Sequence, residues 1–113
     1  MRKTAAECKD MAELRAQIDR IDAELVALFA ERVSYIDRAG QIKTGNGMPA
    51  RIESRVEDVV SKVRGHAAAH GLPPDKLEKL WRKLIEWSIE REEVVLGPSP
   101  GDEVMQAQGN EDV

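Results

Sequence analysis

The chain has 113 residues, a net charge of −4 at neutral pH and only 4 % aromatic residues. At this length it forms at most one small domain, and its acidic balance argues against a nucleic-acid partner, because phosphate binding needs a basic face. The single Cys8 excludes an intramolecular disulfide, and the sequence contains neither a long apolar run nor a signal peptide. We therefore expect a soluble cytoplasmic protein that does not bind a membrane.

Residues 1–9 are polar and without a periodic pattern, and we treat them as an N-terminal arm. Asp10 is followed three residues later by Glu13, which is the pattern of a capping box and predicts that a helix begins here. The helix is expected to continue to about Lys43 or Thr44. Its apolar residues recur every three or four positions, as expected for one buried helix face: Met11, Leu14, Ile18, Ile21, Leu25 and Leu28.

The length of this first helix has a consequence for assembly. About 34 residues at about 1.5 Å each give a helix of roughly 50 Å, which exceeds the diameter of a compact chain of this size. Part of the helix therefore needs a partner from outside its own chain. The simplest partner is a second copy, so we expect a homodimer.

A break at Gly45–Pro49 precedes a second predicted helix, from about Ala50 to His70. Gly71 is suited to the end of this helix, and the prolines that follow prevent its continuation. Its inward-facing residues are expected to be Ile52, Val56, Val59, Val63 and Ala67, with Val60 beside them.

A third helix is predicted from Pro74 to about Val94 or Val95. Residues 97–113 are rich in Pro, Gly and acidic side chains and lack periodicity, so we expect a disordered acidic tail. The sequence therefore predicts an all-α domain over residues 10–96, with one long and two shorter helices. The inward-facing residues of the third helix are expected to be Leu77, Leu80, Trp81, Leu84, Ile85 and Ile89.

Four polar residues interrupt these apolar faces: Arg32 and Lys43 on the first helix, and Ser88 and Glu92 on the third. A charge on a buried face is costly unless it meets an opposite charge. Arg32 and Lys43 are eleven residues apart, so their directions differ by about 20° and their axial separation is about 16 Å. Two cations in this arrangement could bracket a small anion, and Arg55 could join them through the loop.

Each of these residues also has an ordinary structural interpretation. Arg32 can extend to solvent or pair with a carboxylate such as Asp37, and Lys43 can complement the helix dipole. Ser88 can bond to a carbonyl one turn back, and Glu92 can lie on the surface. Because no metal-ligand spacing, phosphate-binding glycine loop or nucleophile–base pair is visible, the pattern alone predicts a helical bundle with an anion pocket and neither metal nor cofactor.

The segments LRAQIDRIDAELVALFAERVSYIDRAGQIK and WRKLIEWSIERE resemble the all-helical (AroQ-class) chorismate mutases, a family that includes isochorismate-pyruvate lyases. The resemblance covers about residues 8–95. It implies an intertwined homodimer whose long first helices span both subunits. It also implies conversion of chorismate to prephenate, in phenylalanine and tyrosine biosynthesis, without a cofactor.

The resemblance also implies roles for individual residues. Arg15, reaching across the dimer, and Arg32 each hold one substrate carboxylate, and Ser88 contacts a carboxylate from the third helix. Arg55 lies near the site. Catalysis is assigned to Arg32 together with two residues at the ether oxygen of the substrate: Lys43 and Glu92.

The sequence departs from the best-known branch of the family at positions near the substrate hydroxyl. That branch has acidic groups there, whereas the corresponding residues here are the apolar Ile52 and Val56. Glu92 also replaces a glutamine, and Trp87 resembles the lyase relatives. Three functions thus stay open: chorismate mutase, isochorismate-pyruvate lyase giving salicylate and pyruvate, and a non-catalytic helical dimerisation or regulatory module.

Overall fold

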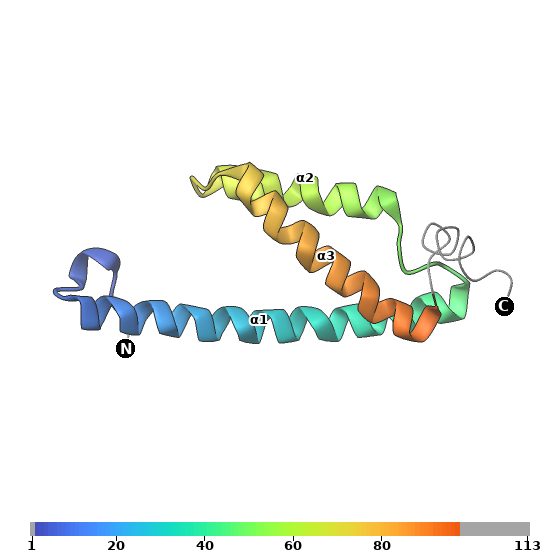
Figure 1. Cartoon of the computed structure of the whole chain (residues 1–113), viewed down its shortest axis with the longest axis horizontal. Helices are drawn as coiled ribbons and strands as arrows, with labels where there is room; N and C mark the ends of the chain where they lie inside the picture. The colour runs from blue at the N-terminus through green and yellow to red at the C-terminus, as the bar shows by residue number, and fades with distance from the viewer. Residues whose placement is uncertain (1, 98–113) are drawn as a thin grey trace, which may run out of the picture. The chain divides into compact units, whose positions relative to one another are not determined.

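The computed structural model describes residues 2–97, which form helices and no strand (Figure 1). The predicted all-α fold, with one long helix followed by two shorter ones, is confirmed over this range. The predicted acidic tail lies, apart from Gly97, outside the described residues. In chain order the elements are the 3-10 helix η1 (Ala5–Glu7), α1 (Met11–Asn46), α2 (Glu53–Ala69) and α3 (Pro74–Leu96).

The start of α1 largely follows the prediction. The carboxylate of Asp10 accepts a hydrogen bond of 2.8 Å from the backbone N–H of Glu13, as an N-cap residue should. In a capping box the Glu13 carboxylate would accept a hydrogen bond from the backbone N–H of Asp10. Here it accepts one from the N–H of Lys9 instead, at 2.7 Å. The N-terminal arm, whose sequence has no periodic pattern, contains the single turn η1.

Glycines in the left-handed conformation end α1 and α2. Gly47 has a φ of 75°, and the N–H of Met48 bonds back to the carbonyl of Lys43 at 3.2 Å. Gly71, predicted at the end of the second helix, has a φ of 72° and the equivalent bond from Leu72. This motif satisfies carbonyls at the helix end that lack helical partners.

The prediction that the second helix begins near Ala50 is wrong, because α2 begins at Glu53. Ile52 has extended dihedral angles (φ −126°, ψ 103°) and precedes the first helical turn. Ala50 is only 4 % exposed and belongs to the apolar core. Burial of this methyl group, directly after Pro49, keeps the segment out of the helix.

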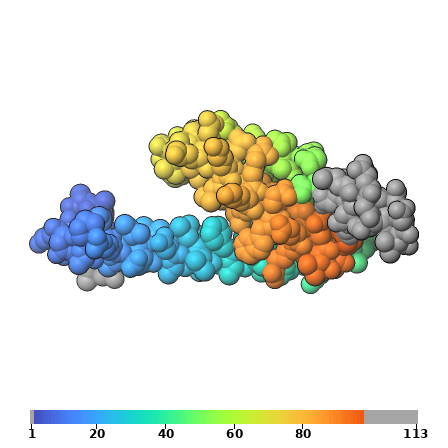
Figure 2. Space-filling view, viewed as in Figure 1, coloured from blue at the N-terminus to red at the C-terminus, as the bar shows by residue number. Residues whose placement is uncertain are grey.

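The chain divides into two units, Met1–Tyr35 and Ile36–Val113, and α1 contributes residues to both. In the second unit, α2 packs against α3, as the space-filling view also shows (Figure 2). Leu80, predicted to face inward, is 56 % exposed, so the buried stripe of α3 is narrower than its apolar spacing predicts. The core of this unit consists of Ala50, Val56, Val60, Ile85 and Ile89, with Val59 and Leu96 packed against it.

The first unit contains η1 and the N-terminal part of α1, and its apolar face is exposed in the single chain. The side chains that the sequence predicts to be buried are about half exposed. A helix with such a face needs a partner to be stable in water. The residues concerned are Met11 (54 %), Ile18 (49 %), Ile21 (45 %), Leu25 (43 %) and Leu28 (59 %).

Candidate functional site

A buried ion pair joins the end of α1 to α3. The ammonium of Lys43 lies 2.7 Å from Oε1 of Glu92, and the two side chains are 16 % and 6 % exposed. The surface interpretation of Glu92 is therefore wrong, and Lys43 does more than complement a helix dipole. Because desolvation offsets most of the attraction in a buried pair, this contact is only weak evidence for a gain in folding stability.

The hydrogen bonding of this pair is incomplete. The ammonium of Lys43 also donates to the carbonyl of Ala50, at 3.0 Å. Oε1 of Glu92 is fully buried, yet within residues 2–97 no donor meets it with hydrogen-bond geometry, in spite of the short distance to Lys43. A ligand donor would complete the hydrogen bonding of this oxygen.

Ser88 lies one turn before Glu92 on the same buried face of α3, as the spacing predicts, and is 7 % exposed. Its hydroxyl donates to the carbonyl of Leu84 at 3.0 Å, which is the local bond expected for a serine in a helix. A serine hydroxyl can accept hydrogen bonds as well as donate them. Ser88 and Glu92 thus place two buried polar groups one turn apart.

A cavity of about 400 Å³ lies between α1 and α3 beside Glu92, and its size suits a small ligand. Gly40 is buried here, and a Cβ added to it would lie 3.9 Å from Cγ of Glu92. Of the predicted site residues, only Glu92 lines this space. The lining residues are Ile36, Asp37, Gly40, Gln41, Arg91, Glu92, Val94 and Val95.

Two features of this cavity were not predicted from the sequence. Arg91 donates two hydrogen bonds, of 2.7 and 3.0 Å, to the carboxylate of Asp37 across the α1–α3 contact. The hydrogen bonds from Arg91 hold the pKa of Asp37 below its usual value. The second feature is Gly40, for which a signal existed, since a glycine inside a helical pattern usually has a packing or functional reason.

Arg55 is not part of the Lys43–Glu92 cluster in this structure. Its side chain is 63 % exposed and lies 2.6 Å from the carboxylate of Asp58, one turn further along α2. Ile52 is half-buried, and Val56 is part of the core. Neither residue offers a polar group to a ligand.

The two remaining predicted residues belong to the first unit. Arg15 is exposed and, within the described range, pairs with no carboxylate, whereas Arg32 is half-buried. They are seventeen residues apart on α1, which corresponds to about 25 Å along the helix axis. One small molecule cannot contact both in the same chain.

None of the described helices is long and apolar enough to cross a membrane. In that same part of the chain, no three side chains of the metal-binding types lie close enough together to share an ion.

Comparison with known proteins places this arrangement in a family. The sequence profile of the family described as chorismate mutase type II matches residues 14–93. The chain belongs to this family. The match covers α2, most of α1 and most of α3, including every site residue predicted from the sequence.

Individual relatives share about three residues in ten with this family member. It is 31 % identical to the T-protein of Enterobacter agglomerans over 83 residues, which is 74 % of the chain but 22 % of the T-protein. It is 31 % identical to the isochorismate pyruvate lyase of Pseudomonas aeruginosa, with 77 % of the chain and 85 % of that protein covered. The chorismate mutase of Methanocaldococcus jannaschii is 30 % identical, with 67 % and 77 % covered. The chain thus spans about a fifth of the T-protein and most of the other two relatives.

Proposed function

We propose that the protein is a chorismate mutase, an intramolecular transferase that converts chorismate to prephenate in phenylalanine and tyrosine biosynthesis. The observation that carries this proposal is the buried Lys43–Glu92 pair with its incompletely satisfied carboxylate, in a chain of the chorismate mutase type II family. The free thiol of Cys8 is in keeping with the reducing cytoplasm, where we expect the enzyme to act.

The reaction sets two tasks for the protein. Chorismate rearranges in one concerted step, in which the ether C–O bond breaks while a new C–C bond forms, so no cofactor or covalent intermediate is needed. The protein must hold the enolpyruvyl ether in its compact diaxial conformation. It must also stabilise the negative charge that develops on the ether oxygen.

We assign the second task to Lys43 and Glu92. The ammonium of Lys43 donates to the ether oxygen, and Glu92 does so when its carboxyl group is protonated. The pair occupies a largely water-excluded position, where such donors act more strongly than in water. Loss of one donor of this kind typically lowers the rate by about 10²–10³.

The first task falls to residues that bind the two substrate carboxylates. We propose that Arg32, assisted by Ser88, holds one of them and that Arg15 of the partner subunit holds the other, with Arg55 nearby. The axial distance of about 25 Å between Arg15 and Arg32 supports a contribution from a second copy. The exposed apolar face of α1 supports the homodimer that this requires.

A second candidate function is isochorismate-pyruvate lyase. This chain aligns with 85 % of the length of the isochorismate pyruvate lyase of Pseudomonas aeruginosa. Val56 is buried in the core and Ile52 is apolar, so neither supplies an acidic group that would select the hydroxyl arrangement of chorismate. The same cations would serve the lyase reaction.

A paired assay separates these functions. Purified protein is incubated with chorismate and, separately, with isochorismate, and the products are identified by chromatography. Prephenate from chorismate is expected. Salicylate and pyruvate as the dominant products would instead identify a lyase.

A lysine–glutamate pair would also suit a non-catalytic helical module, so binding is tested separately. A dicarboxylate transition-state analogue that binds only the folded protein raises its melting temperature. We expect this increase for the wild-type protein and its loss in Arg32→Ala. If folded protein showed neither turnover nor a shift with the analogue, the enzyme proposal would be wrong.

A further inference from the structure

We propose that the ion pair between Arg51 and Glu86 positions the ammonium of Lys43. This inference rests on the proposed function of Lys43 and adds two positioning residues to it. Neither of them is expected to contact the substrate. Arg51, Glu86 and Lys43 all lie in the second unit.

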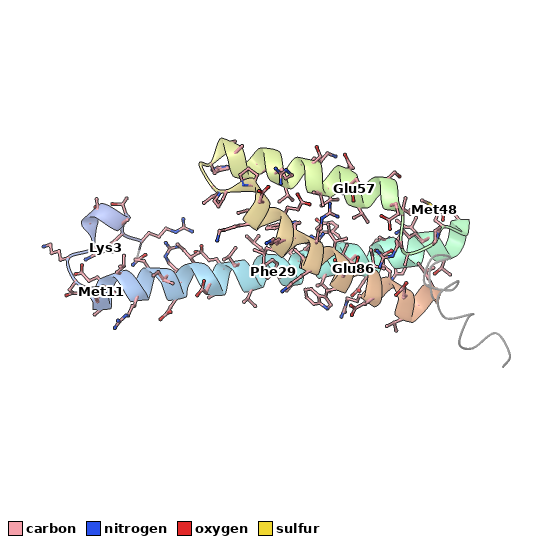
Figure 3. All side chains as sticks on the ribbon, turned by 45° about the horizontal axis from the view of Figure 1, so that its top comes forward. Lys3, Met11, Phe29, Met48, Glu57 and Glu86 are labelled. Carbon is pink, nitrogen blue, oxygen red and sulfur yellow. The ribbon has the colours of Figure 1, made fainter. Side chains whose placement is uncertain are left out.

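Arg51 connects the segment before α2 to α3. Its guanidinium donates two hydrogen bonds, of 2.8 and 2.6 Å, to the two carboxylate oxygens of Glu86. Glu86 projects from α3 (Figure 3). The Arg51 side chain is 22 % exposed and the Glu86 side chain 47 %, so only the arginine is largely shielded from water. The carboxylate of Glu53 lies further from the guanidinium, at 3.7 Å. The two-point contact with Glu86 fixes direction as well as distance.

Arg51 is connected through one peptide bond to the carbonyl that accepts the hydrogen bond from Lys43. The carbonyl of Ala50, which accepts the hydrogen bond from Lys43, belongs to the same planar peptide unit as the N–H of Arg51. On one side of this unit the Ala50 methyl is buried in the core. On the other side Arg51 is held by Glu86. These two anchors set the direction in which the Ala50 carbonyl points.

Lys43 needs an acceptor of fixed direction because its side chain is flexible. A lysine ammonium sits on a flexible four-carbon chain, and the contact with Glu92 lacks hydrogen-bond geometry. The Ala50 carbonyl is therefore the directed acceptor that fixes Lys43 before substrate binds. A displacement of about 1 Å in a reacting or catalytic group can cost about 10²-fold in rate.

A second arginine–glutamate pair provides a matched control. Arg82 on α3 donates two hydrogen bonds, each of 3.1 Å, to the carboxylate of Glu57 on α2. Glu57 and Glu86 are both labelled in Figure 3. Both pairs tie α3 to the polypeptide around α2, but the Glu57 pair involves no residue of the segment between α1 and α2.

The experiment compares Glu86→Gln with Glu57→Gln. Each variant keeps the size of the side chain and removes its charge, so both are expected to lower the melting temperature slightly. In Glu86→Gln we expect kcat for chorismate to fall about tenfold with KM almost unchanged, because the developing charge on the ether oxygen is less well stabilised. Glu57→Gln keeps the wild-type kcat, and the exchanged pair Arg51→Glu/Glu86→Arg recovers most of the loss.

A measurement on the protein without substrate tests the positioning of Lys43 independently of the proposed function. In protein labelled with ¹³C at the lysine ε-carbon, an immobilised Lys43 gives two distinct ε-proton signals, assigned by their absence in Lys43→Arg. We expect these signals to merge in Glu86→Gln and to stay separate in Glu57→Gln.

Two results would overturn the positioning role. One is unchanged Lys43 signals in Glu86→Gln, whatever the activity. The other is an equal loss of kcat in both glutamine variants. A wild-type protein that turns over neither substrate would contradict the proposed function, while the Lys43 signals would still decide whether Glu86 holds the ammonium.

Discussion

Glu92 shows how a single side chain links the fold to the proposed chemistry. Its carboxylate is 6 % exposed and contacts Lys43, and one oxygen meets no donor with hydrogen-bond geometry among the described residues. An ionised carboxylate can only accept hydrogen bonds, whereas a protonated one can also donate. The protonation state of this residue therefore decides whether it can assist at the ether oxygen.

This requirement predicts the effect of replacing Glu92 by glutamine. Glu92→Gln supplies a permanent hydrogen-bond donor of similar size, so kcat for chorismate at neutral pH is expected to be at least as high as in the wild-type protein. The check is kcat for both proteins at the same pH. A kcat about tenfold lower in a folded Glu92→Gln variant would rule out the donor role of Glu92.

Gly40 gives a second prediction for a single residue. Glycine inside a helix costs roughly 0.5–1 kcal/mol relative to alanine, and the added Cβ would make only an ordinary contact, 3.9 Å from Cγ of Glu92. Gly40→Ala should therefore raise the free energy of unfolding by roughly that amount, measured by urea denaturation. A lower stability would show that the site is tighter than this distance indicates.

Arginine–carboxylate pairs connect the helices of the second unit. Asp37 pairs with Arg91 between α1 and α3, and Arg82 joins α3 to Glu57 on α2. The hydrogen bonds from the arginines lower the pKa of Asp37 and the pKa of Glu57 below their usual values. These groups are exposed, so each contributes little by itself and less at high salt.

The lowered pKa values predict how the stability of the folded protein changes at acidic pH. A carboxyl group whose pKa is lower in the folded state stabilises the protein at pH values above its unfolded pKa, which is about 4. This contribution is lost as the pH falls through the folded pKa. The melting temperature at low salt should thus be nearly constant from pH 7 to pH 5 and fall towards pH 3. A melting temperature that stayed constant down to pH 3 would contradict the role of these pairs.

The sequence predicted the helices better than their contacts. Helical spacing placed Ser88 and Glu92 on the buried face of α3, and the residue types typical of helix ends placed Asp10 and Gly71 there. The true start of α2 could not be predicted, because it depends on the burial of the Ala50 methyl in a core built from distant residues. Local helix propensity does not predict such tertiary effects.

The site shows the same limit. Helical spacing identified Lys43 and Glu92 as polar residues on apolar faces, but not that these faces meet; the family resemblance supplied that relation. The pairing of Arg91 with Asp37 was missed for the same reason. Arg55 pairs with Asp58, a neighbour on its own helix. This pair was not predicted, because Arg55 was expected to lie at the substrate site.

For the whole molecule, the central claim is a chorismate mutase site completed by a second copy of the chain. Each site would combine Arg32, Lys43 and Glu92 of one subunit with Arg15 of the other. A mixed dimer of Arg15→Ala and Lys43→Ala chains would then contain one intact site and one doubly defective site. This expectation follows from the two-fold symmetry of such a dimer.

The most direct test of the account is the formation of prephenate by such mixed dimers. Arg15→Ala and Lys43→Ala chains are refolded separately and together in equal amounts, and turnover of chorismate is measured. We expect almost no activity from either variant alone and about a quarter of the wild-type activity from the mixture, since half of the dimers are mixed and each has one intact site. If mixed dimers formed, as shown by native mass spectrometry, and the mixture stayed inactive, the shared site would be contradicted.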